Sequence, residues 1–189
     1  MSEFTPTWQQ PSHPDLIKVV KGDEPYQAAA YSLVSLPAGA LFSKITTATP
    51  ASQDTYTSVA NGENSRIELN SDLVYCNHSC DPSLVFDMTK FEVRVSDRRP
   101  LAVGDALTFF YPSSEWKMVQ PFKCGCNAGA ACLGYIAGAS AIPSSVLSRY
   151  WLNDHVRAFL DRSSNGSEQM AHNMPQSAAE GARVEGAKA

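Results

Sequence analysis

Cysteine spacing gives the chain its clearest chemical signal. Three of the five cysteines, Cys124, Cys126 and Cys132, lie within nine residues. In a reducing compartment, clustered cysteines are more often metal ligands than disulfide partners. Tetrahedral zinc needs four ligands, so a fourth must come from elsewhere, and Cys80 is the natural candidate. The spacing therefore predicts a closed structural zinc site, which has no open position for a catalytic water.

The remaining cysteine and the loop composition bear on this interpretation. Cys76 lies on an apolar run, where a thiol is more often packed in the core than used as a ligand. The stretch 127–131 between the last two clustered cysteines is small and polar, which argues against four unrelated thiols buried in a core. We therefore expect Cys76 to stay outside the metal site.

Polar side chains at two other places could form a cleft. Asn77 and His78 alone indicate a turn whose side chains bond the local backbone. Tyr111 ends an apolar run, where a side chain can face a cleft, although such a tyrosine is usually a core or rim aromatic. A Ser/His/Asp hydrolase built on His78 and its neighbours is disfavoured, because adjacent side chains on one short segment do not easily form a base, a nucleophile and an orienting acid.

Three segments together resemble the motifs of the SET-domain family. They read CNHSCDPSLVF at 76–86, GDALTFFYPS at 104–113 and CGCNAGAAC at 124–132. In this order they are similar to NHSCxP, G(E/D)xLTxxY and the post-SET CxCx4C cluster, although the last gap here has five residues. The resemblance is strong from about Arg66 to Gly138, and the short stretches between the motifs resemble the compact SET proteins.

The resemblance implies a mainly β SET fold of short sheets, with a threaded pseudoknot at the NHSC segment, a zinc-binding post-SET loop and a C-terminal helix. It implies a methyltransferase that uses S-adenosylmethionine, in the first place a protein lysine N-methyltransferase, with Tyr111 as the catalytic residue beside the transferring methyl group. Asn77 and His78 are then expected to bind the cofactor. Phe109 and Phe86 are expected to line the substrate channel. Cys80 is expected to complete the zinc site.

The N-terminal half departs from the family pattern. Alignment on the turn at 37–39 places Gln27, Ala28 and Ala29 at the Gly-x-Gly that binds the cofactor in the family, and Tyr31 at the following aromatic position. Glycine allows the backbone an unusually close approach, so its replacement matters for cofactor binding. Two alternatives therefore stay open. The chain could be a SET-fold enzyme that acts on a small molecule, or a catalytically silent SET-like binding module.

Short β-type runs separated by turn signals must position these residues. We expect an N-terminal arm over 1–15, a SET domain over 16–119 and a post-SET zinc segment over 120–140. A helix is expected over 141–162, where Pro143 can start it and apolar residues recur at helical spacing. The polar composition of 163–189 predicts a disordered tail. The expected β-type runs cover 16–20, 30–36, 41–45, 56–59, 91–95 and 106–111.

Composition limits the partners. The chain has 189 residues, of which 43% are hydrophobic and 18% charged, enough for one folded domain with tails. Its net charge of -4 argues against direct nucleic-acid binding, which needs a broad basic surface. No run approaches the roughly 18 apolar residues of a membrane span, and the N-terminus lacks signal-peptide features. We expect an intracellular protein, cytoplasmic or nuclear, with a protein lysine or a small molecule as substrate and an oligomeric state that the sequence leaves open.

Overall fold

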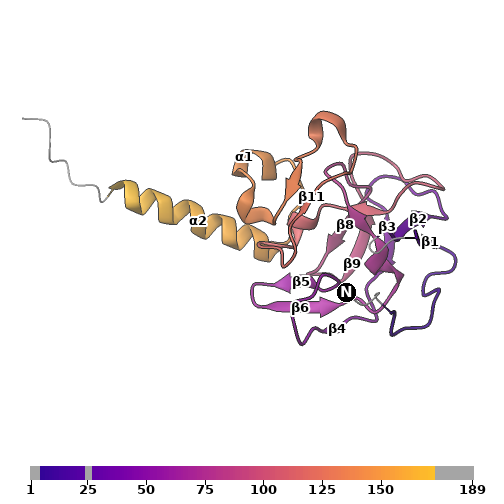
Figure 1. Ribbon diagram of the computed structural model, residues 1–189. Helices are drawn as coiled ribbons and strands as arrows, with labels where there is room; N and C mark the ends of the chain where they lie inside the picture. Colours follow the sequence, from indigo (N-terminus) through magenta and orange to yellow (C-terminus); the bar gives the residue numbers. More distant parts are fainter. Residues whose placement is uncertain (1–4, 24–26, 173–189) are drawn as a thin grey trace, which may run out of the picture.

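The computed structural model describes residues 5–23 and 27–172, and it is built mainly from small β-sheets with few helices (Figure 1). This confirms the expectation of a mainly β chain. The strands are β1 (Ile17–Val20), β2 (Ala29–Ser32), β3 (Leu41–Lys44), β4 (Thr49–Pro50), β5 (Val59–Gly62), β6 (Ser65–Glu68), β7 (Asn77–His78), β8 (Leu84–Asp87), β9 (Glu92–Val95), β10 (Thr108–Phe109), β11 (Phe122–Lys123) and β12 (Tyr135–Ile136).

The main core lies between small sheets whose strands alternate buried and exposed positions. One sheet has the order β3-β9-β8 and another the order β4-β6-β5, all with antiparallel neighbours. In β9, Val93 and Val95 are buried while Glu92 and Arg94 are partly exposed, as the two-residue period of a strand requires. Apolar strand positions therefore face one shared core.

The hairpin of β1 and β2 is continued on its far side by the segment that leads into β10. Tyr31 in β2 lies opposite Lys18 on one side and forms a bridge with Ala106 on the other. The backbone N–H of Leu107 donates to the carbonyl oxygen of Ala30 over 2.8 Å. The hairpin is thereby joined to the strand that approaches the candidate site.

A short parallel pair joins two segments that are far apart in the sequence. In β7 and β10, Asn77 lies opposite Thr108 and His78 lies opposite Phe109. Parallel neighbours need a long crossover connection, which β8 and β9 provide here. The pair brings the NHSC segment to the strand that ends just before Tyr111.

The expectation of a single helix over 141–162 is wrong. The structure has two helices, α1 (Ser144–Leu147) and α2 (Asp154–His172), with a non-helical segment between them. Leu147 and Leu152 are both buried, and the backbone N–H of Asn153 donates to the carbonyl oxygen of Ser113 over 2.9 Å. These tertiary contacts divert the chain from helical geometry even though its apolar residues keep a helical spacing.

Helix α2 extends away from the β body (Figure 1). Because α2 runs to His172, the first part of the segment expected to be a disordered tail is helical. The rest of that expected tail, 173–189, lies outside the described residues. Among the described helices, none has the length and apolar character needed to cross a bilayer.

The N-terminal arm, described from Thr5 onward, is attached to the domain by one buried carboxylate. Asp72, in the 3-10 helix η1 (Asp72–Tyr75), has no exposed surface. Its Oδ1 accepts hydrogen bonds from Trp8 Nε1 at 3.0 Å and Gln10 Nε2 at 2.8 Å, and its Oδ2 accepts one from the Ser12 N–H at 2.7 Å. Burial alone would raise the pKa of Asp72, but these hydrogen bonds outweigh burial and lower it.

Candidate active site and metal centre

The four cysteines expected to bind a metal come together. The sulfur atoms of Cys80, Cys124, Cys126 and Cys132 all lie within 4.8 Å of one another, and those of Cys80 and Cys124 are 4.0 Å apart. Tetrahedral zinc with bonds of about 2.3 Å places its sulfur ligands roughly 3.8 Å apart. The donor set and its spacing therefore fit a four-coordinate metal ion. The predicted grouping of these cysteines is confirmed.

Backbone N–H groups favour a thiolate at Cys126, whereas burial raises the pKa of Cys80 to about 11 and also raises the pKa of Cys124. The N–H of Leu133 donates to Cys80 Sγ over 3.3 Å, and the N–H of Cys80 donates to Cys126 Sγ over 3.5 Å. Desolvation raises the pKa of Cys126, but hydrogen bonds from the backbone of Cys80 and Ala128 and from neighbouring thiols lower it overall to about 7. Metal ligands must be deprotonated, so such donors support metal binding.

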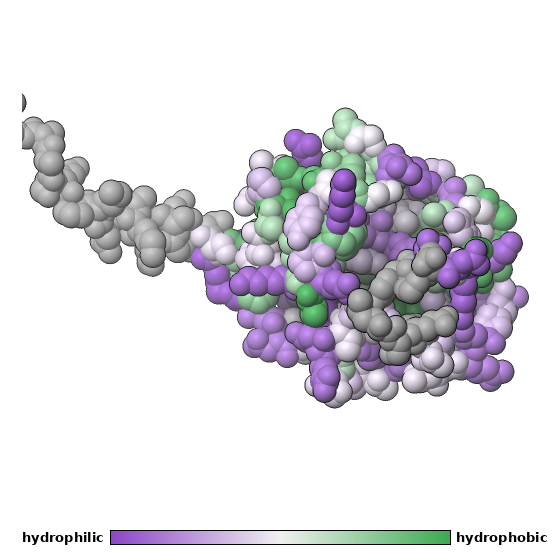
Figure 2. Space-filling model, viewed as in Figure 1, coloured by the Kyte–Doolittle hydropathy of each residue, from purple (hydrophilic) through white to green (hydrophobic). Residues whose placement is uncertain are grey.

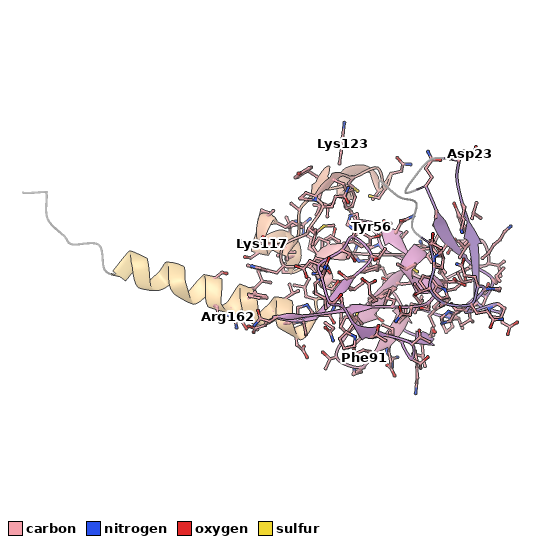
Figure 3. All side chains as sticks on the ribbon, turned by 60° about the horizontal axis from the view of Figure 1, so that its bottom comes forward. Asp23, Tyr56, Phe91, Lys117, Lys123 and Arg162 are labelled. Atoms are coloured by element: carbon pink, nitrogen blue, oxygen red, sulfur yellow. The ribbon has the colours of Figure 1, made fainter. Side chains whose placement is uncertain are left out.

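The β11–β12 hairpin presents three of the ligands. Cys124 follows β11 directly, and its N–H donates to the carbonyl oxygen of Gly134 over 2.9 Å, which closes the base of the loop. Inside the loop, Asn127 and Gly129 both have a φ of 55°, in the left-handed region that asparagine and glycine tolerate best. The extra residue in this loop is thus accommodated by local turns. Lys123, at the end of β11, points away from the body (Figure 3).

Cys76 lies outside the cluster. It is 1% exposed and belongs to the main core, and burial raises the pKa of its thiol. Its carbonyl oxygen, however, accepts a hydrogen bond from the hydroxyl of Tyr111 over 3.2 Å. The structure therefore uses the backbone of Cys76 to orient the tyrosine, while the side chain packs in the core.

His78 stands between the cysteine cluster and Tyr111. Its Nδ1 accepts a hydrogen bond from the backbone N–H of Tyr111 over 3.2 Å, so the ring proton belongs on Nε2, which lies 3.3 Å from Cys80 Sγ. Burial lowers the pKa of His78 to about 4, which keeps the imidazole neutral. Burial, with smaller contributions from Cys76 and Glu115, raises the pKa of Tyr111 and keeps its phenol protonated.

The side chain of Asn77 contacts the backbone of the N-terminal segment. Asn77 Nδ2 donates to the carbonyl oxygen of Ala28 over 2.9 Å. The side chain of Gln27 lies against Gly22, where even a methyl group on residue 22 would collide with it. Ala29 pairs with Val20 in the β1–β2 hairpin. The expected cofactor-binding stretch is therefore adjacent to Asn77, and Gln27 packs within its own hairpin.

The two expected channel residues are buried. Phe86 is 0% exposed and Phe109 5% exposed; their rings stack with centroids 4.2 Å apart, and the Phe109 ring lies 4.7 Å from that of Tyr111. A residue without exposed surface cannot line an open channel. In this structure Phe86 supports Phe109 from the core side, and Phe109 in turn supports Tyr111.

Sequence reasoning missed several residues that hold the site together. The ring of Phe122 lies 5.7 Å from that of His78 and 6.1 Å from that of Tyr111, so β11 contributes an aromatic wall. The hydroxyl of Tyr150 donates to the carbonyl oxygen of Cys80 over 2.9 Å. Neither residue belongs to the motifs that identified the site. The only available signal was the aromatic position two residues before Cys124.

Asn153 is a buried polar connector that the sequence gives no reason to single out. Its Oδ1 accepts from the N–H of Met88 at 2.8 Å, and its Nδ2 donates to the carbonyl oxygens of Phe86 and Ser113, both at 3.1 Å. It therefore ties the segment before α2 to β8 and to η2 (Tyr111–Ser113), the 3-10 turn that begins with the candidate catalytic tyrosine.

A buried ion pair fixes the chain just after that turn. Glu115 is 7% exposed; its Oε2 lies 2.8 Å from Arg66 Nη1, and its Oε1 accepts from the N–H of Ala60 over 2.9 Å. The next residue, Trp116, packs directly against Gly138, which has a φ of 110°. A side chain at position 138 would press on the Trp116 backbone, so glycine is required there.

Two surface pockets are formed by residues other than Asn77 and Tyr111. A wide pocket of about 470 Å³ is lined by Gln10, Val19, Lys21 and Asp72, together with Pro11, and a smaller one lies near Arg149. Neither pocket is lined by Asn77 or Tyr111. On the view in Figure 2, hydrophobic surface gathers in the upper part of the body, where Figure 1 places α1 and β11.

The chain matches no family model. It is 68% identical over 160 residues to a protein of Aspergillus flavus named methyltransferase flvH, and the match covers 85% of this chain and 89% of that protein. An identity this high over nearly the whole length of both proteins shows common descent and a shared fold. The chain therefore belongs to the same protein family as methyltransferase flvH.

Proposed function

We propose that this chain is a SET-type methyltransferase that transfers a methyl group from S-adenosylmethionine to an amine, in the first place the side-chain amine of a protein lysine. The relative named methyltransferase supports the reaction class. The observation that carries the proposal is the position of Tyr111, whose backbone is bonded to His78 and whose hydroxyl is bonded to the Cys76 carbonyl. Asn77 lies in the same segment, in contact with the Ala28 carbonyl.

Methyl transfer of this kind needs little general acid or base catalysis. When bound, S-adenosylmethionine supplies an electrophilic methyl group on a positively charged sulfur. The methyl acceptor would be a neutral amine, and its nitrogen–carbon bond would form as the carbon–sulfur bond breaks, with the positive charge passing to nitrogen. The protein must align the two groups and exclude water. No strong base is needed during the transfer itself.

Tyr111 suits this task. Its phenol stays protonated because burial raises its pKa, and its hydrogen is donated to the Cys76 carbonyl. The phenol oxygen therefore keeps its lone pairs for weak contacts with a polarised methyl group. The rings of Phe109 and Phe122 pack against the same tyrosine and cover part of its surface. Tyr111 thus positions the reacting groups without itself changing protonation state.

The cysteine cluster suits a structural zinc ion. With Cys80, Cys124, Cys126 and Cys132 as ligands, no coordination position is left for water, so the ion supplies mechanical connection. It would join the segment after β7 to the β11–β12 hairpin. Since Phe122 lies on that hairpin, this connection also holds one aromatic wall of the site.

Calorimetric titration of the metal-loaded protein with S-adenosylmethionine tests the proposal. We expect binding at one site per chain, and Asn77→Ala should weaken it, whereas Asn64→Ala, at an exposed turn, should leave it unchanged. Methyl transfer is then measured on lysine-containing peptides and on free small amines, which separates the two substrate classes. Absence of binding by the intact protein overturns the proposal.

A further inference from the structure

A small pocket lies on the side of the molecule where the segment between α1 and α2 packs against the sheet β3-β9-β8. Its volume is about 190 Å³, roughly the space of six water molecules at about 30 Å³ each. Val85 contributes a half-buried apolar side chain beside the buried Pro82 and Leu84, and Tyr150 and Trp151 add aromatic surface. We call this space the Arg149 pocket, because Arg149 also lines it.

The Arg149 pocket is separate from the candidate active site. Phe110 lines it and stacks on Tyr150, with ring centroids 3.8 Å apart and planes 8° apart. The neighbouring side chains, Phe109 and Tyr111, contact each other instead, with centroids 4.7 Å apart. Successive side chains along an extended segment point to opposite faces. The pocket and Tyr111 therefore use different faces of the same stretch of chain.

One of the two arginines in the pocket is fully engaged. The guanidinium of Arg98 lies over the Tyr150 ring, 4.9 Å from its centroid. It also donates to the carbonyl oxygen of Arg149 over 2.8 Å and forms an ion pair with Asp81 at 3.3 Å. Arg98 is thereby held as a fixed wall of the pocket, and its charge is largely balanced.

The other arginine is available. Within residues 5–23 and 27–172, the guanidinium of Arg149 takes part in no hydrogen bond or ion pair. The remaining charged group in the lining is Asp97, whose Oδ1 faces Gly39: a methyl group there would lie 2.8 Å from it. The lining thus includes an exposed, unpaired cation at Arg149 next to apolar and aromatic residues, whereas the Asp97 carboxylate lies beside Gly39, just before β3.

We propose that the Arg149 pocket binds a small carboxylic acid with an apolar body. Arginine pairs with carboxylates through two parallel hydrogen bonds, which gives both strength and orientation. Ligand pockets are typically apolar with a few polar groups that fix the orientation, as here. Because roughly 300 Å³ is the lower end for drug-sized ligands, the volume selects a molecule about as large as one ring with a carboxylate.

Benzoate is a suitable probe, added to the full-length, metal-loaded protein in a calorimetric titration. We expect benzoate to bind in the millimolar range. Benzamide, which has the same ring without the charge, should bind at least about 10-fold more weakly. Inorganic phosphate supplies charge without an apolar body and is also expected to bind more weakly. Equal binding of benzoate and benzamide, or no benzoate binding in the millimolar range, overturns the proposal.

Substitutions locate the site. Arg149→Ala should weaken benzoate binding by about 10-fold, and Arg149→Lys should have an intermediate effect because it keeps the charge but loses the paired hydrogen bonds. Asp97→Asn should strengthen binding, because it removes a nearby negative charge. Arg99→Ala, which removes an exposed arginine paired with Asp105 outside the lining, is the matched control and should change nothing. Unchanged affinity in Arg149→Ala would show that benzoate binds elsewhere.

Discussion

His78 and Cys80 lie side by side, with the imidazole Nε2 3.3 Å from the thiol sulfur. The other nitrogen of the same ring accepts the backbone N–H of Tyr111. One side chain therefore connects a predicted metal ligand to the residue proposed to position the reacting groups. The metal centre and the active site share this connection, so disturbance of one should be measurable at the other.

Replacing Cys80 by serine should abolish metal binding. Three remaining thiolates leave the tetrahedral site incomplete, and the fully buried Cys80 is the ligand that ties the loop to β7. Metal content measured on the purified protein should fall from one ion per chain to nearly none. Cys76→Ala, which removes a core thiol outside the cluster, should keep its metal. Full metal content in Cys80→Ser would refute the assigned ligand set.

Chelation should loosen the β11–β12 hairpin before the rest of the domain. The hairpin is short, and without the ion its loop loses its attachment to Cys80. Hydrogen exchange should speed up first over 120–136 and only later in β8 and β9, whose backbones pair within the core sheet. Simultaneous loss of protection in both regions would instead mean that the metal supports the entire domain.

Tyr111→Phe should lower turnover about 10-fold or more while costing only about 1 kcal/mol of stability, because one buried hydrogen bond to the Cys76 carbonyl is lost. Methyl-transfer kinetics and thermal unfolding measure the two effects separately. Tyr135→Phe, at a tyrosine that is 61% exposed, is the control and should alter neither. A mutant with normal turnover would remove Tyr111 from the proposed mechanism.

Asn153→Ala should destabilise the fold strongly. It leaves the N–H of Met88 and the carbonyls of Phe86 and Ser113 without their side-chain partner in a buried place. We expect a loss of about 3 kcal/mol or more in the free energy of unfolding. Denaturant titration measures it, with the exposed Asn64→Ala as control. A loss of free energy of unfolding well below that of one hydrogen bond would mean that water takes over the hydrogen bonds of the Asn153 side chain.

Acid should release the N-terminal arm. The pKa of Asp72 in the folded protein lies below its unfolded value of about 3.9, because Gln10, Trp8 and Ser12 donate to the ionised carboxylate. The stability that the ionised Asp72 carboxylate contributes is fully present above its pKa in the unfolded chain. It is lost as the pH falls through the pKa of Asp72 in the folded protein. Fluorescence of Trp8, in a variant with Trp116 and Trp151 replaced by Phe, follows the release.

Asp72→Asn provides the matching test for this acid effect. The amide cannot accept all the hydrogen bonds that the carboxylate accepts, so the arm should be loosened at neutral pH as well, and the acid transition in Trp8 fluorescence should disappear. An acid transition that persists in Asp72→Asn would assign the pH dependence to another group.

The metal cluster was the most predictable part of the site, for a physical reason. Cys124, Cys126 and Cys132 are so close in sequence that any compact loop brings their thiols together, and the coordination number of zinc then asks for one more ligand. Cys80 was available because Cys76 lies on an apolar run. This argument uses only local spacing and one coordination rule.

Residues whose roles depend on distant partners were not predictable. Asn153 is bonded to groups 40 to 67 residues away, and no spacing reveals such contacts. An aromatic residue suits both a channel and a core, so the sequence could not tell that Phe86 is fully buried. Apolar residues between Val146 and Leu160 have helical spacing, yet the contacts of Leu152 and Asn153 break the helix in two.

The order in which the chain is synthesised has a consequence for the cysteine cluster. Cys80 precedes Cys124 by 44 residues. At a translation rate of about 5–20 residues per second, Cys124 is therefore synthesised roughly 2 to 9 seconds after Cys80. During this interval the nascent protein presents a lone thiol, which holds a metal ion poorly. Only a chain that has been translated through Cys132 can close the cluster. A product that stops earlier therefore lacks both β12 and the closed cluster, and cellular proteases should remove it faster.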